Sequence, residues 1–271
     1  MWRMKEYLCG ELKDIEIFVR PERAKIFKRA KIEKESSPSQ RNLNDKNAEK
    51  YFVRFIHKNF TRKDLFLDLT FEGPFLPKTR KAAIKEFKNY IARVNRWRKK
   101  QGLKKLKYVY VFSEQDELGE EARFHFHVVV ENMDREVLEE KWGLGYANTD
   151  RLKFNEIGVQ GKTGYMARQG GAKGTRTWGS STGLKKVEAK TSDKAIKKNM
   201  IAAMERNPED RAYFEKLFDK KKEGWVFTSC EIKDNLITGT SFLIKMRKYD
   251  VPDYISKARK KEYMEHIDIP F

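Results

Sequence analysis

The chain is poor in cysteine and in long apolar runs, and each shortage excludes a class of protein. Its two cysteines, Cys9 and Cys230, lie far apart and cannot form a disulfide framework, which favours a reducing compartment. Its apolar runs are shorter than the roughly 20 residues that a transmembrane helix needs, and no signal peptide is recognisable. We therefore expect a cytoplasmic protein without a membrane partner.

Acidic residues are also in deficit, with 40 Asp and Glu against 59 Lys and Arg, so that the formal net charge is +19. Such an excess favours a polyanionic partner, above all nucleic acid. A solvated surface rich in Lys and Glu, as in thermophilic proteins, is the alternative. Hydrophobic residues make up 39% of the chain, which is enough for a packed core.

Of the four histidines, two lie in one stretch, residues 123–130 (RFHFHVVV). Phe, His and Val alternate there with a period of two, which is typical of a half-buried β-strand. His125 and His127 therefore share one strand face, and Phe124 and Phe126 the other. Two imidazoles on one face can bind one divalent cation. A strand whose polar face happens to carry two histidines is the alternative.

Strands and helices alternate through the middle of the chain. Period-two patterns predict strands over residues 12–20, 65–71, 107–113, 123–130 and 151–155. Apolar spacings of three and four predict helices over residues 43–59, 79–99 and 134–142. From residue 65 the order is β-α-β-β-α-β, which is typical of the ferredoxin-like or split βαβ arrangement. The predicted fold class is α+β, with an antiparallel sheet that has helices on one face and an open second face.

Three regions are predicted along the chain. Residues 1–42 form a basic N-terminal accessory region, and residues 43–186 contain the β-α-β-β-α-β unit and the stretch after it. Residues 187–271 form a C-terminal extension of helices and strands. Its helical part is predicted over residues 194–222, and its strands over residues 225–229 and 236–245.

A cation bound by two histidines needs a third ligand and must keep open positions for its substrate. Glu114 ends the strand before the histidines, and antiparallel pairing would bring it beside them. Asp68, on a neighbouring strand, is a weaker candidate, and Glu114 is alternatively a loop residue of an acidic hairpin. Two histidines and one carboxylate suit Mg²⁺ or Mn²⁺ acting on a phosphodiester.

A nucleophile for such a substrate follows the unit. Tyr165 lies in a predicted short helix over residues 161–169, and Arg168 is one turn later on the same helical face. A tyrosine phenolate can attack phosphorus and form a phosphotyrosine link, while Arg168 could contact the phosphate or the phenolate. Most of the eleven tyrosines are expected to be packing residues, as Tyr108 and Tyr110 are in their strand.

Residues 161–200 form a glycine-rich basic tract with ten Lys and Arg against two acidic residues. A solvated surface is the usual explanation of such a run, but this one directly follows the histidine strand and the tyrosine. Its tryptophan could stack on a nucleobase. The residues predicted to bind DNA are Lys162, Lys173, Arg176, Trp178, Lys185, Lys186 and Lys190.

The strand FHFHVVV, the preceding YVYVFSE and the later tyrosine helix together resemble the HUH endonucleases, specifically the rolling-circle replication initiators of plasmids and filamentous-type phages. The resemblance covers roughly residues 43–186, including the LFLDLTF strand. It implies an HUH nuclease domain in which His125, His127 and Glu114 bind Mg²⁺ or Mn²⁺. Tyr165 would be the nicking tyrosine.

Two features depart from the pattern of that family. Arg168 stands where the family usually has lysine one turn after the tyrosine. Arginine keeps the charge but does not readily give up a proton, so a role in positioning phosphate is retained and a role in protonating the leaving group is not. Only one tyrosine stands at the site, which resembles the single-tyrosine type.

The resemblance implies a metal-dependent nickase and strand transferase that starts rolling-circle replication of a plasmid or viral replicon in the cytoplasm of a prokaryotic host. Its substrate would be a single-stranded origin in a hairpin loop, cut to a 5′-phosphotyrosine link and a free 3′-OH. No Walker P-loop occurs, so a separate helicase and a host polymerase are expected as partners. The alternatives are a conjugative relaxase, a single-tyrosine transposase, or a non-catalytic protein that binds single strands.

Overall fold

The computed structural model describes residues 1–20, 38–115, 121–152, 166, 178–221, 223–234 and 239–248. Its chain divides into two units. The central unit is Lys34–Val187, and the terminal unit combines Met1–Glu33 with Glu188–Phe271. The terminal unit thus combines most of the predicted N-terminal region with the predicted C-terminal region. Among the described residues, no helix combines the length and apolarity needed to cross a membrane.

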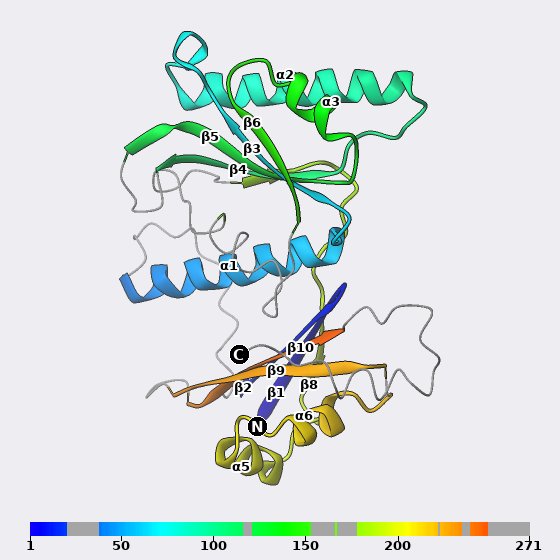
Figure 1. Ribbon diagram of the computed structural model, residues 1–271. Coiled ribbons are helices and arrows are strands. Elements are labelled where there is room, and N and C mark those ends of the chain that lie inside the picture. The colour runs from blue at the N-terminus through cyan, green and yellow to red at the C-terminus, as the bar shows by residue number, and fades with distance from the viewer. Residues whose placement is uncertain are drawn as a thin grey trace. The chain divides into compact units, whose positions relative to one another are not determined.

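Five antiparallel strands form the sheet of the central unit, in the order β6-β3-β5-β4-β7 (Figure 1). The strands are β3 (Leu65–Thr70), β4 (Tyr108–Gln115), β5 (Glu121–Val130), β6 (Ala147–Arg151) and β7 (Trp178–Ser180). The helices are α1 (Pro38–Asn59), the short η1 (Gly73–Phe75), α2 (Arg80–Lys100) and α3 (Arg135–Glu140). From β3 to β6 the element order is β-α-β-β-α-β. The α+β class and the antiparallel sheet are thus confirmed.

Helices cover both faces of this sheet, with α2 and α3 on one side and α1 on the other (Figure 1). On the α2 side, Phe87 stacks on Phe126 of β5 with ring centroids 4.7 Å apart. On the α1 side, Phe52 and Ile56 belong to one buried cluster with Val129 of β5. The predicted open face is therefore wrong for this part of the sheet. The aromatic side of α1 needs an apolar surface, and the strands supply one on this face too.

The end of β3 is held by the turn before β6. Thr70 donates its backbone N–H to the carbonyl of Tyr146, and Glu72 donates to the carbonyl of Leu144. Gly145 lies between these two carbonyls with φ of 149°, where a Cβ atom would approach the Thr70 oxygen to 2.6 Å and the Glu72 nitrogen to 2.5 Å. Only glycine allows backbones to approach so closely.

Gly145→Ala is therefore expected to destabilise the protein by about 1–3 kcal/mol, since the backbone conformation is strained for alanine and β3 or the turn must move. Thermal unfolding followed by circular dichroism measures this loss. Gly73→Ala is the matched control, because nothing lies within 4 Å of its Cβ position. Equal melting temperatures of the two variants would contradict the assigned packing of this turn.

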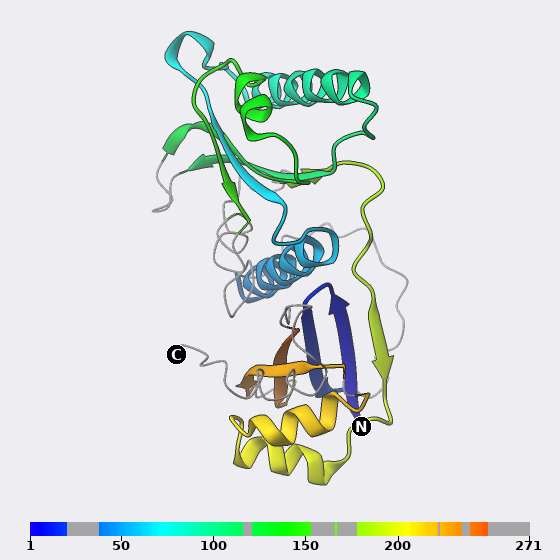
Figure 2. The same ribbon diagram turned by 45° about the vertical axis from the view of Figure 1, so that its right-hand side comes forward.

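The terminal unit contains a second antiparallel sheet, in the order β8-β1-β2-β10-β9. Its strands are β1 (Trp2–Cys9), β2 (Leu12–Val19), β8 (Ala189–Ser192), β9 (Trp225–Lys233) and β10 (Ser241–Lys248). Two helices, α5 (Lys198–Arg206) and α6 (Arg211–Phe218), replace the single predicted helical stretch. Ile15 and Ile17 of β2, Met204 of α5 and Phe214 of α6 share its buried core. Figure 2 shows both helices on one face of this sheet.

Candidate functional site

The two histidines of β5 lie side by side on the sheet face that α1 covers. His125 pairs in register with Thr70 of β3, and His127 pairs with Asp68. Their ring centroids are 4.9 Å apart, and the ring planes are nearly perpendicular, at 84°. The period-two alternation of the strand produces this arrangement, because side chains two residues apart point to the same face.

Both imidazole rings are oriented through Nδ1. His127 Nδ1 lies 2.5 Å from Oδ1 of Asp68, and His125 Nδ1 lies 2.8 Å from the carbonyl oxygen of Arg123. A carbonyl or a carboxylate only accepts, so Nδ1 is the donor in each contact and carries the ring proton. The lone pair of a neutral ring then lies on Nε2. Histidines that bind metals are commonly held in this way by a carboxylate or a carbonyl group.

The two rings suit a divalent cation, and each would offer Nε2 to it. Among the described residues, no third ligand lies beside the pair. No group of three His, Cys, Asp or Glu side chains in this part of the chain could hold a metal ion. Asp68 accepts a hydrogen bond from Nδ1 of His127 and so orients the ring from the side opposite Nε2. The structure thus provides a pair of imidazole rings, each oriented through Nδ1.

Glu114, the predicted third ligand, contacts a different partner. Its Oε1 lies 2.9 Å from Nη1 of Arg80, at the start of α2. The guanidinium of Arg80 also lies over the ring of Phe112, 4.6 Å from its centroid, on the α2 side of the sheet. In β4, Val111 and Ser113 pair with His127 and His125. Because side chains alternate along a strand, Glu114 belongs to the face of Phe112, opposite the histidines.

The predicted nucleophile and its neighbour, Tyr165 and Arg168, lie outside the described residues. Met166 is described and is completely buried, in the cluster that also contains Phe66. The ring of Phe66 in turn stacks on His127, with centroids 6.0 Å apart. The residue next to Tyr165 is therefore packed on the same side of the sheet as the histidine pair.

The residues predicted to bind DNA are divided among several places. Lys162, Lys173 and Arg176 lie outside the described residues. Lys185 and Lys186 are exposed in the central unit, whereas Lys190 is exposed on β8 of the terminal unit.

Trp178, whose predicted role is to stack on a nucleobase, is half-buried and packs against α1. Its ring centroid is 5.4 Å from that of Phe52 and 5.7 Å from that of Phe55. Near it, the amide of Asn59 donates to the carbonyl of Lys185 and accepts from the Lys185 N–H. The end of α1 thus holds the chain that follows β7.

The contacts of Asp68 and Asn59 differ in how far the sequence indicates them. Asp68 interrupts the otherwise apolar strand LFLDLT, and a single carboxylate in such a strand marks a position where a polar partner is needed. The role of Asn59 had no comparable signal, because its partner is far away in the sequence.

Comparison with known families identifies a relative for this region. Residues 64–170 match the family model of the replication-associated protein ORF2. This stretch lies within the central unit and contains Asp68, His125, His127 and Tyr165. Comparisons with curated proteins and with solved structures gave no match. In the part that carries the histidine pair, the chain is thus similar to a replication-associated protein.

Proposed function

We propose that this protein is a metal-dependent, single-tyrosine DNA nickase of the HUH type that starts rolling-circle replication. The observation that carries the proposal is the pair of Nδ1-oriented histidines within the region that matches a replication-associated family. The sheet order β6-β3-β5-β4, with α2 and α3 on one face, also supports a ferredoxin-like core for this nuclease domain.

His125 and His127 would hold Mg²⁺ or Mn²⁺ through Nε2, and Asp68 would keep His127 in the required tautomer. When bound, such a cation supplies polarisation of a phosphate oxygen and stabilises the departing oxygen. Glu114 remains a proposed ligand only if its contact with Arg80 is exchanged for one with the cation.

Tyr165 would carry out the covalent step. After its proton has passed to water, the phenolate oxygen attacks phosphorus and the bond from phosphorus to the 3′ oxygen breaks. The 3′ oxygen takes the bonding electron pair and a proton, which gives a free 3′-OH for a host polymerase. The 5′ phosphate stays on Tyr165, and Arg168 would position it. The reverse reaction rejoins strands.

A nicking assay tests the proposal. The protein is incubated with a labelled pool of randomised single strands, with Mn²⁺, with Mg²⁺ or with EDTA, and the products are separated on a denaturing gel. We expect shortened strands and a protein-linked product in the presence of either cation and neither in EDTA. Binding without either product, in all conditions, would favour a non-catalytic single-strand binder.

The roles of the two carboxylates can be separated by substitution. Asp68→Asn should lower the nicking rate by roughly 10- to 100-fold, as is usual when the hydrogen-bond partner of a ligand histidine is changed. Glu114→Gln should lower it much less, because its described partner is Arg80. Single-turnover nicking measures both variants. The reverse ranking would return Glu114 to the role of third ligand.

A further inference from the structure

The outward side of α2 carries a row of cations. These residues follow one another at spacings that keep them on one side of the helix, and all are exposed. The row, here called the outer basic stripe, consists of Lys81, Lys85, Lys88, Arg96 and Lys99. At 1.5 Å per residue it extends over roughly 27 Å.

None of the stripe cations pairs with a carboxylate among the described residues, whereas Arg80, Arg93 and Arg98 of the same helix each bind a partner outside it. Arg80 pairs with Glu114, and Arg98 pairs with Glu131 while donating to the carbonyl of Lys104. Arg93 donates to the carbonyls of Lys141 and Trp142. The cations that hold α2 in place and the cations of the stripe are thus two separate sets.

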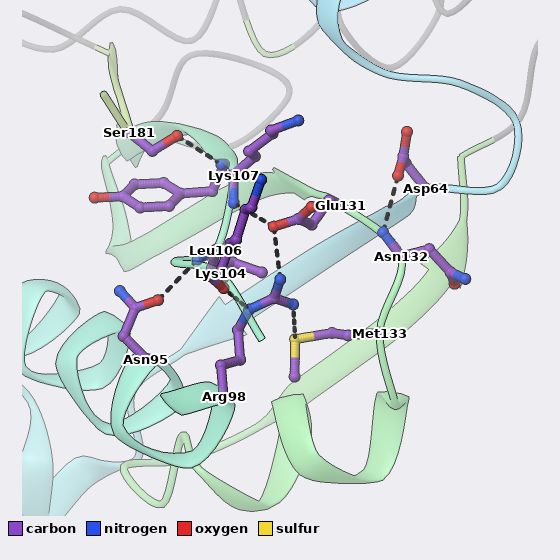
Figure 3. Close-up of polar contacts among 11 residues, drawn as sticks. Asp64, Asn95, Arg98, Lys104, Leu106, Lys107, Glu131, Asn132, Met133 and Ser181 are labelled. Carbon is purple, nitrogen blue, oxygen red and sulfur yellow. Dashed lines mark hydrogen bonds and ion pairs between the residues drawn. The ribbon is translucent and has the colours of Figure 1, made fainter. Parts of the chain in front are cut away.

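The helix itself is firmly anchored to its sheet, as Figure 3 shows for its C-terminal end. There the side chain of Asn95 accepts from the N–H of Leu106 at 2.8 Å, and Arg98 contacts both Glu131 and Met133. At the other end, Thr79 caps the helix by accepting from Ala82. The stripe is therefore a rigid and straight array of charges.

The stripe is unfavourable for the helix that carries it. Like charges three and four residues apart, such as Lys81, Lys85 and Lys88, repel one another and destabilise a helix. The only acidic residue within α2 is Glu86, whose carboxylate contacts Asn89 of the same helix. A polyanion lying along the stripe would remove this repulsion.

We propose that the outer basic stripe binds the phosphate backbone of double-stranded DNA that adjoins the single strand to be cut. This inference rests on the proposed function and names a second DNA segment for it. Proteins that bind single strands usually add aromatic side chains on which bases stack. The stripe has none, because Phe87 and Tyr90 are buried and Trp97 is half-buried, whereas a duplex backbone is recognised by charge alone.

The stripe and the histidine pair lie on opposite sides of one sheet. Phe126 of β5 packs under α2, while its neighbours His125 and His127 point to the other face. One short DNA segment cannot occupy both places. A substrate with a duplex part and a single-stranded part can reach both by passing around an edge of the sheet.

The test compares two triple variants that each remove three positive charges. K81Q/K85Q/K88Q alters the stripe, and K216Q/K220Q/K221Q alters exposed lysines of the terminal unit. Fluorescence anisotropy measures the affinity for a short labelled duplex at several salt concentrations. The stripe variant should bind at least about tenfold more weakly at 0.1 M salt. The slope of its log affinity against log salt concentration should become shallower by about 0.9 for each phosphate that it no longer neutralises.

The stripe variant should keep the nicking rate of the parent on a single strand without a duplex part, and its melting temperature should not fall. An unchanged salt slope, or an equal loss in the control variant, would refute the stripe as a duplex site. If the parent nicks no DNA but only the stripe variant loses duplex affinity, the stripe is supported and the nickase proposal fails.

Discussion

Tyr165→Phe is expected to abolish the covalent protein–DNA adduct completely while leaving the affinity for the same single strand unchanged. The substitution removes one oxygen and keeps the ring and the net charge, so a loss must come from the chemistry. With the parent, a labelled strand and Mn²⁺ should give a denaturation-resistant band that carries the DNA 3′ of the cut. Peptide mapping should find the nucleotide on the tryptic peptide that contains Tyr165.

Other tyrosines provide the control for this experiment. Tyr146→Phe makes the same chemical change at an exposed position of the central unit and should leave the adduct intact. Burial raises the pKa of the Tyr108 phenol, which disfavours the phenolate that attack requires. An adduct on Tyr108, Tyr110 or Tyr263 would keep the enzyme class and refute the assigned nucleophile.

His125→Ala and His127→Ala should each lower the nicking rate by roughly a thousandfold or more. Loss of a proposed ligand would remove the proposed cation, whose effect on a transition state is typically several kcal/mol, and about 1.4 kcal/mol corresponds to a factor of ten. Single-strand affinity should change little, because the basic side chains are untouched. Single-turnover nicking and anisotropy on the same strand measure the two quantities.

The fourth histidine of the chain, His266, offers a matched control, since His266→Ala should keep the nicking rate of the parent. Circular dichroism is needed for His127→Ala in particular, because the variant leaves Asp68 without its imidazole partner. Full nicking by both histidine variants, or by the parent in EDTA, would exclude the proposed metal site.

Local patterns predict the elements of the central unit well. The period of two in RFHFHVVV identifies β5 and the shared face of its histidines, because a strand fixes side-chain direction residue by residue. The prediction places β6 at residues 151–155, but it is Ala147–Arg151. Its sequence, ANTDR, is polar and is recognised as a strand only through its pairing with β3.

Two other predictions overlook a local signal. Antiparallel pairing brings the end of β4 beside the histidines, but side-chain alternation puts Ser113 on their face, and Glu114 contacts Arg80 instead. The helix predicted over residues 194–222 ignores Pro208, which follows the end of α5 at Arg206. Both signals are present in the sequence, since the alternation of YVYVFSE decides the face of Glu114 and the proline marks the end of a helix.

The strand order of the terminal unit has a consequence for the time at which this unit can form. Its strand β2 pairs with β1 on one side and with β10 on the other, and β10 ends at Lys248. During synthesis, about 220 residues must leave the ribosome between β2 and β10, and domains commonly fold as soon as they emerge. The central unit can thus fold first, while one edge of β2 has no partner strand and the side chains of Ile15 and Ile17 are exposed to solvent. A chain interrupted before residue 241 would keep that edge open and would be prone to aggregate.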